Sequence, residues 1–230
     1  YVEVEANAGP TGVEVIFQVR AMRYFSTFRL EPSKLLERPL SAYSRLPLGE
    51  KFSTAQVEKM RLETVHLLEN NGYFNPTVTV DYPESDNPLL VTVVYKAMTA
   101  PTRATIGTID IQTQQQTFTD REIREALHLK TGDEFQQEKV DQSVAAVRKL
   151  FANRGKNFGF LNTHIQAVPM YVEATNTVNL NIALDPGRLT LVEVNPPKVP
   201  DKKLRDMVPV FEEGTIDDDL IEEGRVHIVE

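Results

Sequence analysis

The chain of 230 residues contains no cysteine and no tryptophan. Without cysteine it can form no disulfide, no thiolate zinc site and no thiol nucleophile. It also lacks an excess of basic residues, because 25 Lys and Arg stand against 33 Asp and Glu, giving a net charge of −8. A partner with a phosphate backbone requires clustered cations, so this charge favours a polypeptide partner over a nucleic acid.

Long apolar runs are missing as well. No stretch approaches the roughly 20 apolar residues of a membrane-spanning helix. The chain opens at Tyr1 without an initiator Met and without the charged and apolar regions of a signal peptide. Its 41% hydrophobic and 25% charged residues are ordinary for soluble globular protein. We therefore expect a soluble segment whose targeting signal would lie outside this sequence.

An internal repeat is the most informative feature that is present. Residues 72–78 (GYFNPTV) match residues 159–165 (GFLNTHI), and residues 49–52 (GEKF) match residues 132–135 (GDEF). The first pair of segments is separated by four residues more than the second, which predicts an insertion around residues 155–158. Self-similarity of this kind predicts an array of one small unit, and such arrays commonly present surfaces for binding.

Alternating and helical periodicities predict the order β-α-α-β-β within the unit. In the first copy we expect strands at about 24–30, 77–80 and 89–95, a short helix from Ser33, and a longer helix after a capping box at Ser53–Gln56. In the second copy we expect a strand at 105–111, a capping box at Thr119–Glu122, a helix through Val140 and Phe151, and a hairpin from His164 to Leu184.

These signals divide the chain into four segments. Residues 1–20 form the closing hairpin of a preceding unit, residues 21–99 and 100–186 form two complete units, and residues 187–230 begin a further, truncated unit. Joints are expected near residues 20–23, 98–104 and 185–188, where few contacts should cross. The expected arrangement is an elongated array.

Two glycine–aromatic pairs receive a structural interpretation. Gly72 and Gly159 are expected to end the longer helices in the left-handed conformation that glycine adopts easily. The aromatic residues that follow them, Tyr73 and Phe160, are expected to cap the core of each unit.

Residues with catalytic or metal-binding potential are scattered. His66, His128, His164 and His227 have no partner at an i+4 spacing, so they indicate neither a zinc pair nor a catalytic relay. The acids at 217–219 are consecutive, unlike the alternating ligands of an EF-hand, and suit the first turn of a helix. The sequence therefore predicts no catalytic residue, no cofactor site and no metal site.

The order of elements, the GEKF and TGDEF approaches to the second helix, and the Gly-Tyr-Phe and Gly-Phe-Leu motifs resemble polypeptide-transport-associated (POTRA) domains. The likeness is to the arrays of outer-membrane barrel assembly factors of the BamA and TamA type, also called bacterial surface antigens. It covers essentially the whole chain, including residues 211–215 (FEEGT). It implies an α+β fold of tandem units, each a three-stranded mixed sheet backed by two helices.

The resemblance also implies that the protein is not an enzyme and that it functions at the periplasmic face of the bacterial outer membrane. The implied partners are unfolded outer-membrane or secreted polypeptides, accessory assembly lipoproteins, and a C-terminal β-barrel of the same parent chain, with no nucleic acid. A client would pair with an edge strand by β-augmentation. In the family this edge is usually the strand after the second helix, and Pro169 agrees because proline is tolerated in edge strands. The expected binding residues are Thr77, Val78, Thr79 and Val80 in the first unit, and His164, Ile165, Gln166, Ala167 and Val168 in the second.

Two alternatives remain open. The same fold could serve as the POTRA scaffold of a two-partner secretion translocator or of a cell-division protein. A KH-like nucleic-acid-binding array shares a β-α-α-β core and uses a Gly-x-x-Gly turn. The corresponding segments here, residues 49–52 and 132–135, lack the second glycine and are partly acidic.

Overall fold

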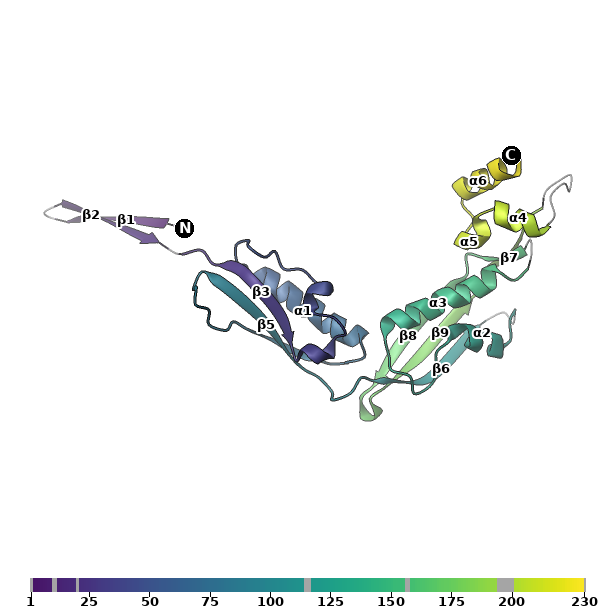
Figure 1. The fold of residues 1–230 in the computed structure, drawn as a ribbon, viewed down its shortest axis with the longest axis horizontal. Helices are drawn as coiled ribbons and strands as arrows, with labels where there is room; N and C mark the ends of the chain where they lie inside the picture. The colour runs from purple at the N-terminus through teal and green to yellow at the C-terminus, as the bar shows by residue number, and fades with distance from the viewer. Residues whose placement is uncertain are drawn as a thin grey trace. The chain divides into compact units, whose positions relative to one another are not determined.

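The computed structural model describes residues 2–9, 12–19, 21–113, 117–155, 158–193 and 201–229. The chain divides into two compact units, Tyr1–Thr102 and Arg103–Glu230 (Figure 1). Each unit contains a three-stranded mixed sheet with helical elements on one face. The fold is therefore α+β, as the sequence predicts.

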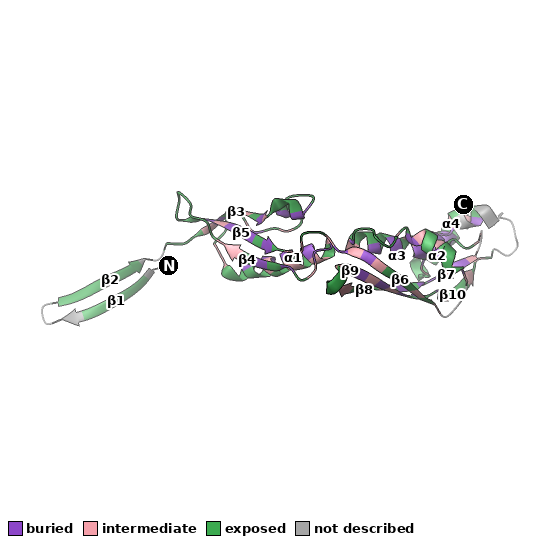
Figure 2. Ribbon diagram, turned by 90° about the horizontal axis from the view of Figure 1, so that it is seen from below, coloured by how far each residue is buried: buried purple, intermediate pink, exposed green. Residues whose placement is uncertain are grey.

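The chain opens with the expected hairpin, formed by β1 (Val2–Gly9) and β2 (Gly12–Val19). The two strands are antiparallel, with Val4 opposite Phe17 and Ala6 opposite Val15. Because side chains alternate across a strand, these apolar residues share one face. That face is exposed, and 64% of the surface of Phe17 is accessible (Figure 2). The assignment of this hairpin to a preceding unit stays a prediction, and residues 10 and 11 of its turn lie outside the described residues.

The sheet of the first unit has the order β3-β5-β4. It consists of β3 (Tyr24–Glu31), β4 (Thr77–Asp81) and β5 (Leu90–Met98), in which β3 runs parallel and β4 antiparallel to the central β5. Helix α1 (Thr54–Asn70) covers one face. Its buried residues recur at helical spacing and join the core with alternate residues of the strands, including Val57, Met60, Leu68, Phe25, Val78, Val93 and Tyr95.

The first unit departs from the expected pair of helices. The short helix predicted from Ser33 is a 3-10 turn, η1 (Ser33–Leu35), followed by a second turn, η2 (Leu40–Ala42). Prolines at 39 and 47 interrupt this connection, and proline cannot continue a helix because it lacks an N–H and its ring clashes with the preceding turn. Leucines at 35, 36, 40 and 46 are nevertheless buried. The segment thus covers the sheet without forming a regular helix.

The two ends of α1 differ in how well the sequence predicts them. Ser53 has the extended backbone of an N-cap, but its side chain makes no capping hydrogen bond, so the predicted capping box is wrong. Packing supplies most of the stability of such a helix, so the bond is dispensable. At the other end Gly72 has φ +87°, and the N–H of Tyr73 donates to the carbonyl of Leu68 over 2.9 Å. This is the expected left-handed cap, of the Schellman type.

The second unit repeats the sheet order as β6-β9-β8. Its strands are β6 (Thr105–Thr113), β8 (His164–Val172) and β9 (Thr177–Asp185), and the turn between the last two contains η3 (Glu173–Thr175). Two helices back the sheet, α2 (Asp120–Leu127) and α3 (Gln137–Ala152). The capping box at Thr119 and Glu122 is confirmed, since both reciprocal hydrogen bonds are present.

Gly159 does not have the role predicted for it. It lies in a short strand, β7 (Phe158–Leu161), and its φ is outside the left-handed region. Helix α3 ends at Ala152, farther ahead of this glycine than α1 ends ahead of Gly72, so Gly159 cannot cap it. The chain requires glycine for another reason, because a Cβ at 159 would overlap the carbonyl of Ala152. Of the predicted insertion, residues 156 and 157 lie outside the described residues.

Within the second unit, the segment after β9 packs against α3 and β7. Strand β10 (Arg188–Leu191) pairs antiparallel with β7, and three short helices follow, α4 (Asp201–Met207), α5 (Val210–Glu213) and α6 (Asp218–Val229). A buried cluster joins them to α3 and β7 through Ala152, Leu161, Leu204, Val208, Val210 and Phe211. The expectation that few contacts cross residues 185–188 is therefore wrong.

Two polar contacts reinforce this junction immediately before β8. The N–H of Asn162 donates to the carbonyl of Gly214 over 2.9 Å. The hydroxyl of Thr163 donates to the carbonyl of Pro186 over 3.2 Å. The beginning of β8 is thereby tied to the C-terminal segment.

Candidate functional site

The strands expected to bind clients both lie at a sheet edge. β4 and β8 are the outer members of the orders β3-β5-β4 and β6-β9-β8, so each has one neighbour in its own sheet. An edge strand presents unpaired backbone donors and acceptors to which an extended segment can add. The predicted residues 77–80 and 164–168 fall within these two strands.

Contacts to β4 show which of its backbone groups point outward. Arg61 Nη1 donates to the carbonyl oxygen of Val78 over 3.4 Å from outside the sheet. Thr79 Oγ1 donates to the carbonyl of Lys96, its partner in β5. Since the N–H and C=O of one residue point to the same side and alternate along a strand, Val78 and Val80 direct their backbone groups outward. The backbone groups of Thr77, Thr79 and Asp81 point toward β5.

The same alternation of backbone directions identifies the residues of β8 whose N–H and C=O groups point outward. Ile165 pairs with Leu184 in the second unit as Val78 pairs with Ala97 in the first. The outward positions are then 165, 167, 169 and 171. Pro169 is one of them, so its missing N–H removes no bond to β9. An incoming strand would find outward donors at Ile165 and Ala167, and an interruption at Pro169.

The side chains of β8 alternate between the core and the open face of the sheet. Ile165 is buried and Ala167 partly buried, whereas His164, Gln166 and Val168 are exposed. Met170, also exposed, receives a contact from the Asn181 amide to its sulfur at 3.1 Å. A client on this edge would therefore meet polar side chains near the start of β8 and an apolar pair, Val168 and Met170, farther along.

A hollow of about 970 Å³ adjoins the start of β8. Residues of β6, α2, β8 and β9 line it, among them Thr113, Glu122, His164, Gln166 and Asp185. Two further lining residues are in contact, because the Arg154 guanidinium lies 4.4 Å from the centre of the Phe118 ring. The hollow is of mixed polarity, so side chains of either kind that project from a bound strand could enter it.

The opposite edge of each sheet is partly covered by its own chain. In the first unit the N–H of Phe25 donates to the carbonyl of Glu50, and the N–H of Gly49 donates to the carbonyl of Phe25. In the second unit Ile106 makes the corresponding pair of bonds with Asp133 and Gly132, each over 2.8 Å. The GEKF segment therefore hydrogen-bonds to the start of β3, and the GDEF segment to the start of β6, which leaves these backbone groups unavailable to an added strand. Sequence reasoning missed this role, although the repeat of both segments was a signal for it.

This geometry also bears on the KH alternative. In a KH domain the turn between the helices clamps a nucleic-acid backbone. Here the N–H groups of Gly49, Phe52, Gly132 and Phe135 donate to carbonyls of the unit itself. They are used within the fold and are not offered to a phosphate.

The aromatic residues of both glycine–aromatic pairs contact the core of their unit. Tyr73 is buried in the first core. Phe160 packs on the second core, with its ring 6.0 Å from that of Phe151 in an edge-on arrangement. Within the described residues no group of three or more His, Asp or Glu is placed to hold a metal ion. In that same part of the chain, no helix combines the length and apolar character needed to cross a membrane.

The solved structures that are similar to this chain include the following three. The POTRA3–5 region of BamA from Haemophilus influenzae is 20% identical, with 90% of this chain and 85% of that one covered and a TM-score of 0.47. The N-terminal domain of Omp85 from Thermosynechococcus elongatus is 14% identical, with coverages of 80% and 75% and a TM-score of 0.33. CdiB from Acinetobacter baumannii is 15% identical, with coverages of 73% and 30% and a TM-score of 0.34. A search of the curated proteins found no match.

The family comparison is more direct. The POTRA family model, described as the surface antigen variable number repeat, matches residues 104–187. These limits enclose the whole β6-β9-β8 sheet with α2 and α3. The chain therefore contains a POTRA domain of the surface antigen type at residues 104–187.

Proposed function

We propose that this chain is the periplasmic POTRA region of an outer-membrane β-barrel assembly factor, and that it receives unfolded outer-membrane polypeptides by adding them to an edge strand. Residues 21–99 of the first unit would be a second POTRA domain, since their sheet has the same order and the same strand directions as the sheet of the second unit. Accessory lipoproteins and a C-terminal β-barrel of the parent chain are the further partners. The role is one of binding and scaffolding, without enzymatic chemistry.

The open edge of β8 is the observation that supports this proposal most. It is nine residues long and presents outward backbone groups at alternate positions. Binding through these groups would be weak and tolerant of sequence, because the main chain supplies the hydrogen bonds and alternate side chains add only limited selectivity. Such tolerance suits a receiver of many different unfolded clients.

Proline substitution in β8 tests the mechanism. Ile165 is unsuitable, because its buried side chain would be lost from the core together with the N–H. Ala167→Pro removes an outward N–H at a small, partly buried residue, and should reduce binding of a barrel-derived peptide several-fold while leaving the unfolding midpoint nearly unchanged. Gln166→Pro is the matched control, because it removes an N–H that faces β9 and should destabilise the unit.

Binding is read from amide shifts in an NMR titration of the whole chain. We expect the shifts to gather on residues 164–168 and to weaken in Ala167→Pro. Shifts confined to α2 and α3, with no shift on β8, would refute the edge mechanism.

A further inference from the structure

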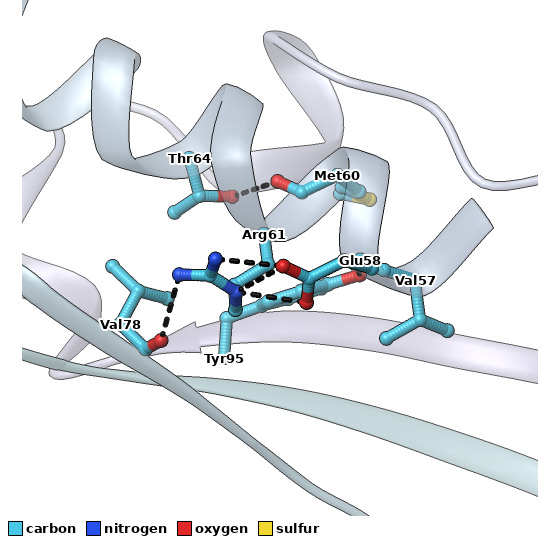
Figure 3. A network of polar contacts seen from close by, with 7 residues as sticks. All are labelled: Val57, Glu58, Met60, Arg61, Thr64, Val78 and Tyr95. Carbon is cyan, nitrogen blue, oxygen red and sulfur yellow. Dashed lines mark hydrogen bonds and ion pairs between the residues drawn. The ribbon is translucent and has the colours of Figure 1, made fainter. Parts of the chain in front are cut away.

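The two edge strands are not equally open, and the difference comes from Arg61. This residue lies on α1 and reaches over β4, where its Nη1 donates to the outward carbonyl of Val78 over 3.4 Å (Figure 3). Val78 and Val80 are the outward residues of a strand only five residues long. One of the two outward carbonyls of β4 is therefore already engaged.

The Arg61 side chain is held in place from its other side. Its Nε donates to both carboxylate oxygens of Glu58 over 3.0 and 2.9 Å, and its Nη2 donates to Glu58 Oε1 over 2.7 Å (Figure 3). A guanidinium is a rigid planar fork, so fixing Nε and Nη2 also fixes the direction of Nη1. The side chain is 26% exposed, so it lies partly embedded against the unit.

The corresponding contact in the second unit falls outside the edge strand. Arg148 of α3 donates from Nε to the carbonyl of Thr163 over 3.4 Å, and Thr163 precedes β8. In the described part of the chain, the hydrogen bonds include none from a side chain to the carbonyls of Ile165 or Ala167. The outward groups at the start of β8 are thus left for a partner.

We propose that Arg61, fixed by Glu58, is a guard that closes the edge of the first unit to strand addition and so directs an incoming polypeptide to β8. The inference rests on the proposed function, because it assigns a preference between two edges of the same kind. An added strand must take the Val78 carbonyl from Arg61 and move the guanidinium out of its path. The edge of β4 becomes available when another group binds the Arg61 guanidinium and separates it from the Val78 carbonyl. A carboxylate on the client or on an accessory protein can do this, because it forms strong, bidentate hydrogen bonds with a guanidinium.

The test is an NMR titration of the full 230-residue chain with a synthetic peptide that has the alternating sequence of a barrel strand. In the wild type we expect shifts on residues 164–168 and none on residues 77–81. In Arg61→Ala the β4 amides should respond, with affinity at that edge raised about fivefold, the factor that one recovered hydrogen bond contributes. Glu58→Gln should act in the same direction with a smaller effect, and it retains the arginine if Arg61→Ala proves unstable.

Lys59→Ala is the matched control, since Lys59 is an exposed neighbour on α1 whose charge is lost without touching β4. A measurement without peptide checks the contact itself: the amide shift of Thr79, which is bonded to the Val78 carbonyl, should change in Arg61→Ala and not in Lys59→Ala.

The outcomes separate the guard from the function on which it rests. If β8 responds to peptide in every variant while β4 stays silent in Arg61→Ala and Glu58→Gln, the guard is refuted and the proposed function stands. Equal responses of β4 and β8 in the wild type would also refute the guard. If neither edge responds in any variant, the proposed function is overturned and the guard with it.

Discussion

Gly159 lies against the carbonyl oxygen of Ala152 so closely that no Cβ fits between them. The contact joins β7 to the last residue of α3, next to the buried cluster that holds the C-terminal segment within the second unit. A larger residue here must displace backbone rather than the tip of a flexible side chain.

The first prediction compares the two repeated glycines. Gly159→Ala should destabilise the second unit by about 3 kcal/mol through overpacking against backbone. Gly72→Ala should cost the first unit about 1 kcal/mol, because its cost comes from the left-handed conformation at φ +87°. Asparagine tolerates that conformation, so Gly72→Asn should recover part of the loss while Gly159→Asn should not. Urea unfolding followed by unit-specific hydrogen exchange measures both, and equal costs at the two sites would contradict the steric explanation.

The second prediction concerns the helix caps. Thr119→Ala should cost about 1 kcal/mol, because it removes the hydroxyl that accepts from the Glu122 N–H and donates to the Glu122 carboxylate, and leaves only the bond from the Thr119 backbone N–H. Ser53→Ala should change stability by less than about 0.5 kcal/mol, because the Ser53 side chain caps nothing. A loss on Ser53→Ala as large as that on Thr119→Ala would show that the hydroxyl of Ser53 does cap α1 in solution.

These cases show what the sequence could predict. The strands and the longer helices follow from local periodicity, which is a feature of neighbouring residues, whereas the edge position of β8 follows from the resemblance to POTRA domains, with which Pro169 agrees. The conformation of Gly159 depends on Ala152, and the role of Arg61 depends on where the Val78 carbonyl points. Both are set by tertiary packing. The prediction of a regular first helix in the first unit is wrong. It rested on the apolar residues Leu35 and Leu36 and gave too little weight to the prolines that prevent a regular helix.

The third prediction concerns acid pH. Hydrogen bonds from Arg61 hold the pKa of Glu58 below its ordinary value, and the hydrogen bond from Lys96, 2.6 Å from Asp81, does the same for the pKa of that residue. A carboxyl with a lowered folded-state pKa stabilises the fold above its unfolded-state pKa, and the contribution disappears as the pH falls through the folded-state pKa. Carboxyl shifts followed by NMR should show both low midpoints. Arg61→Ala should return only Glu58 to its ordinary range, and a simultaneous change at Asp81 would contradict independent pairs.

The fourth prediction concerns alkaline pH. Tyr95 is fully buried, and its hydroxyl donates to the carbonyl of Val57 over 3.2 Å (Figure 3). Burial raises the pKa of this phenol, so its stabilising contribution is complete below the unfolded-state pKa and is lost as the pH rises toward the folded-state value. Ultraviolet titration should show one tyrosine that ionises only when the first unit unfolds. Tyr95→Phe should abolish that step at a cost of about 1 kcal/mol, and an unchanged step would assign it to another tyrosine.

Asn162 and Thr163 hold the start of β8 to the C-terminal segment through Gly214 and Pro186. A strand fixed at its beginning cannot slip along its neighbour, and a slip of one residue would turn every side chain of β8 to the opposite face. The two hydrogen bonds therefore fix the register of β8 against its neighbour β9. Under the proposed function, an added polypeptide would meet outward donors that stay at Ile165 and Ala167, because β8 cannot shift beside it.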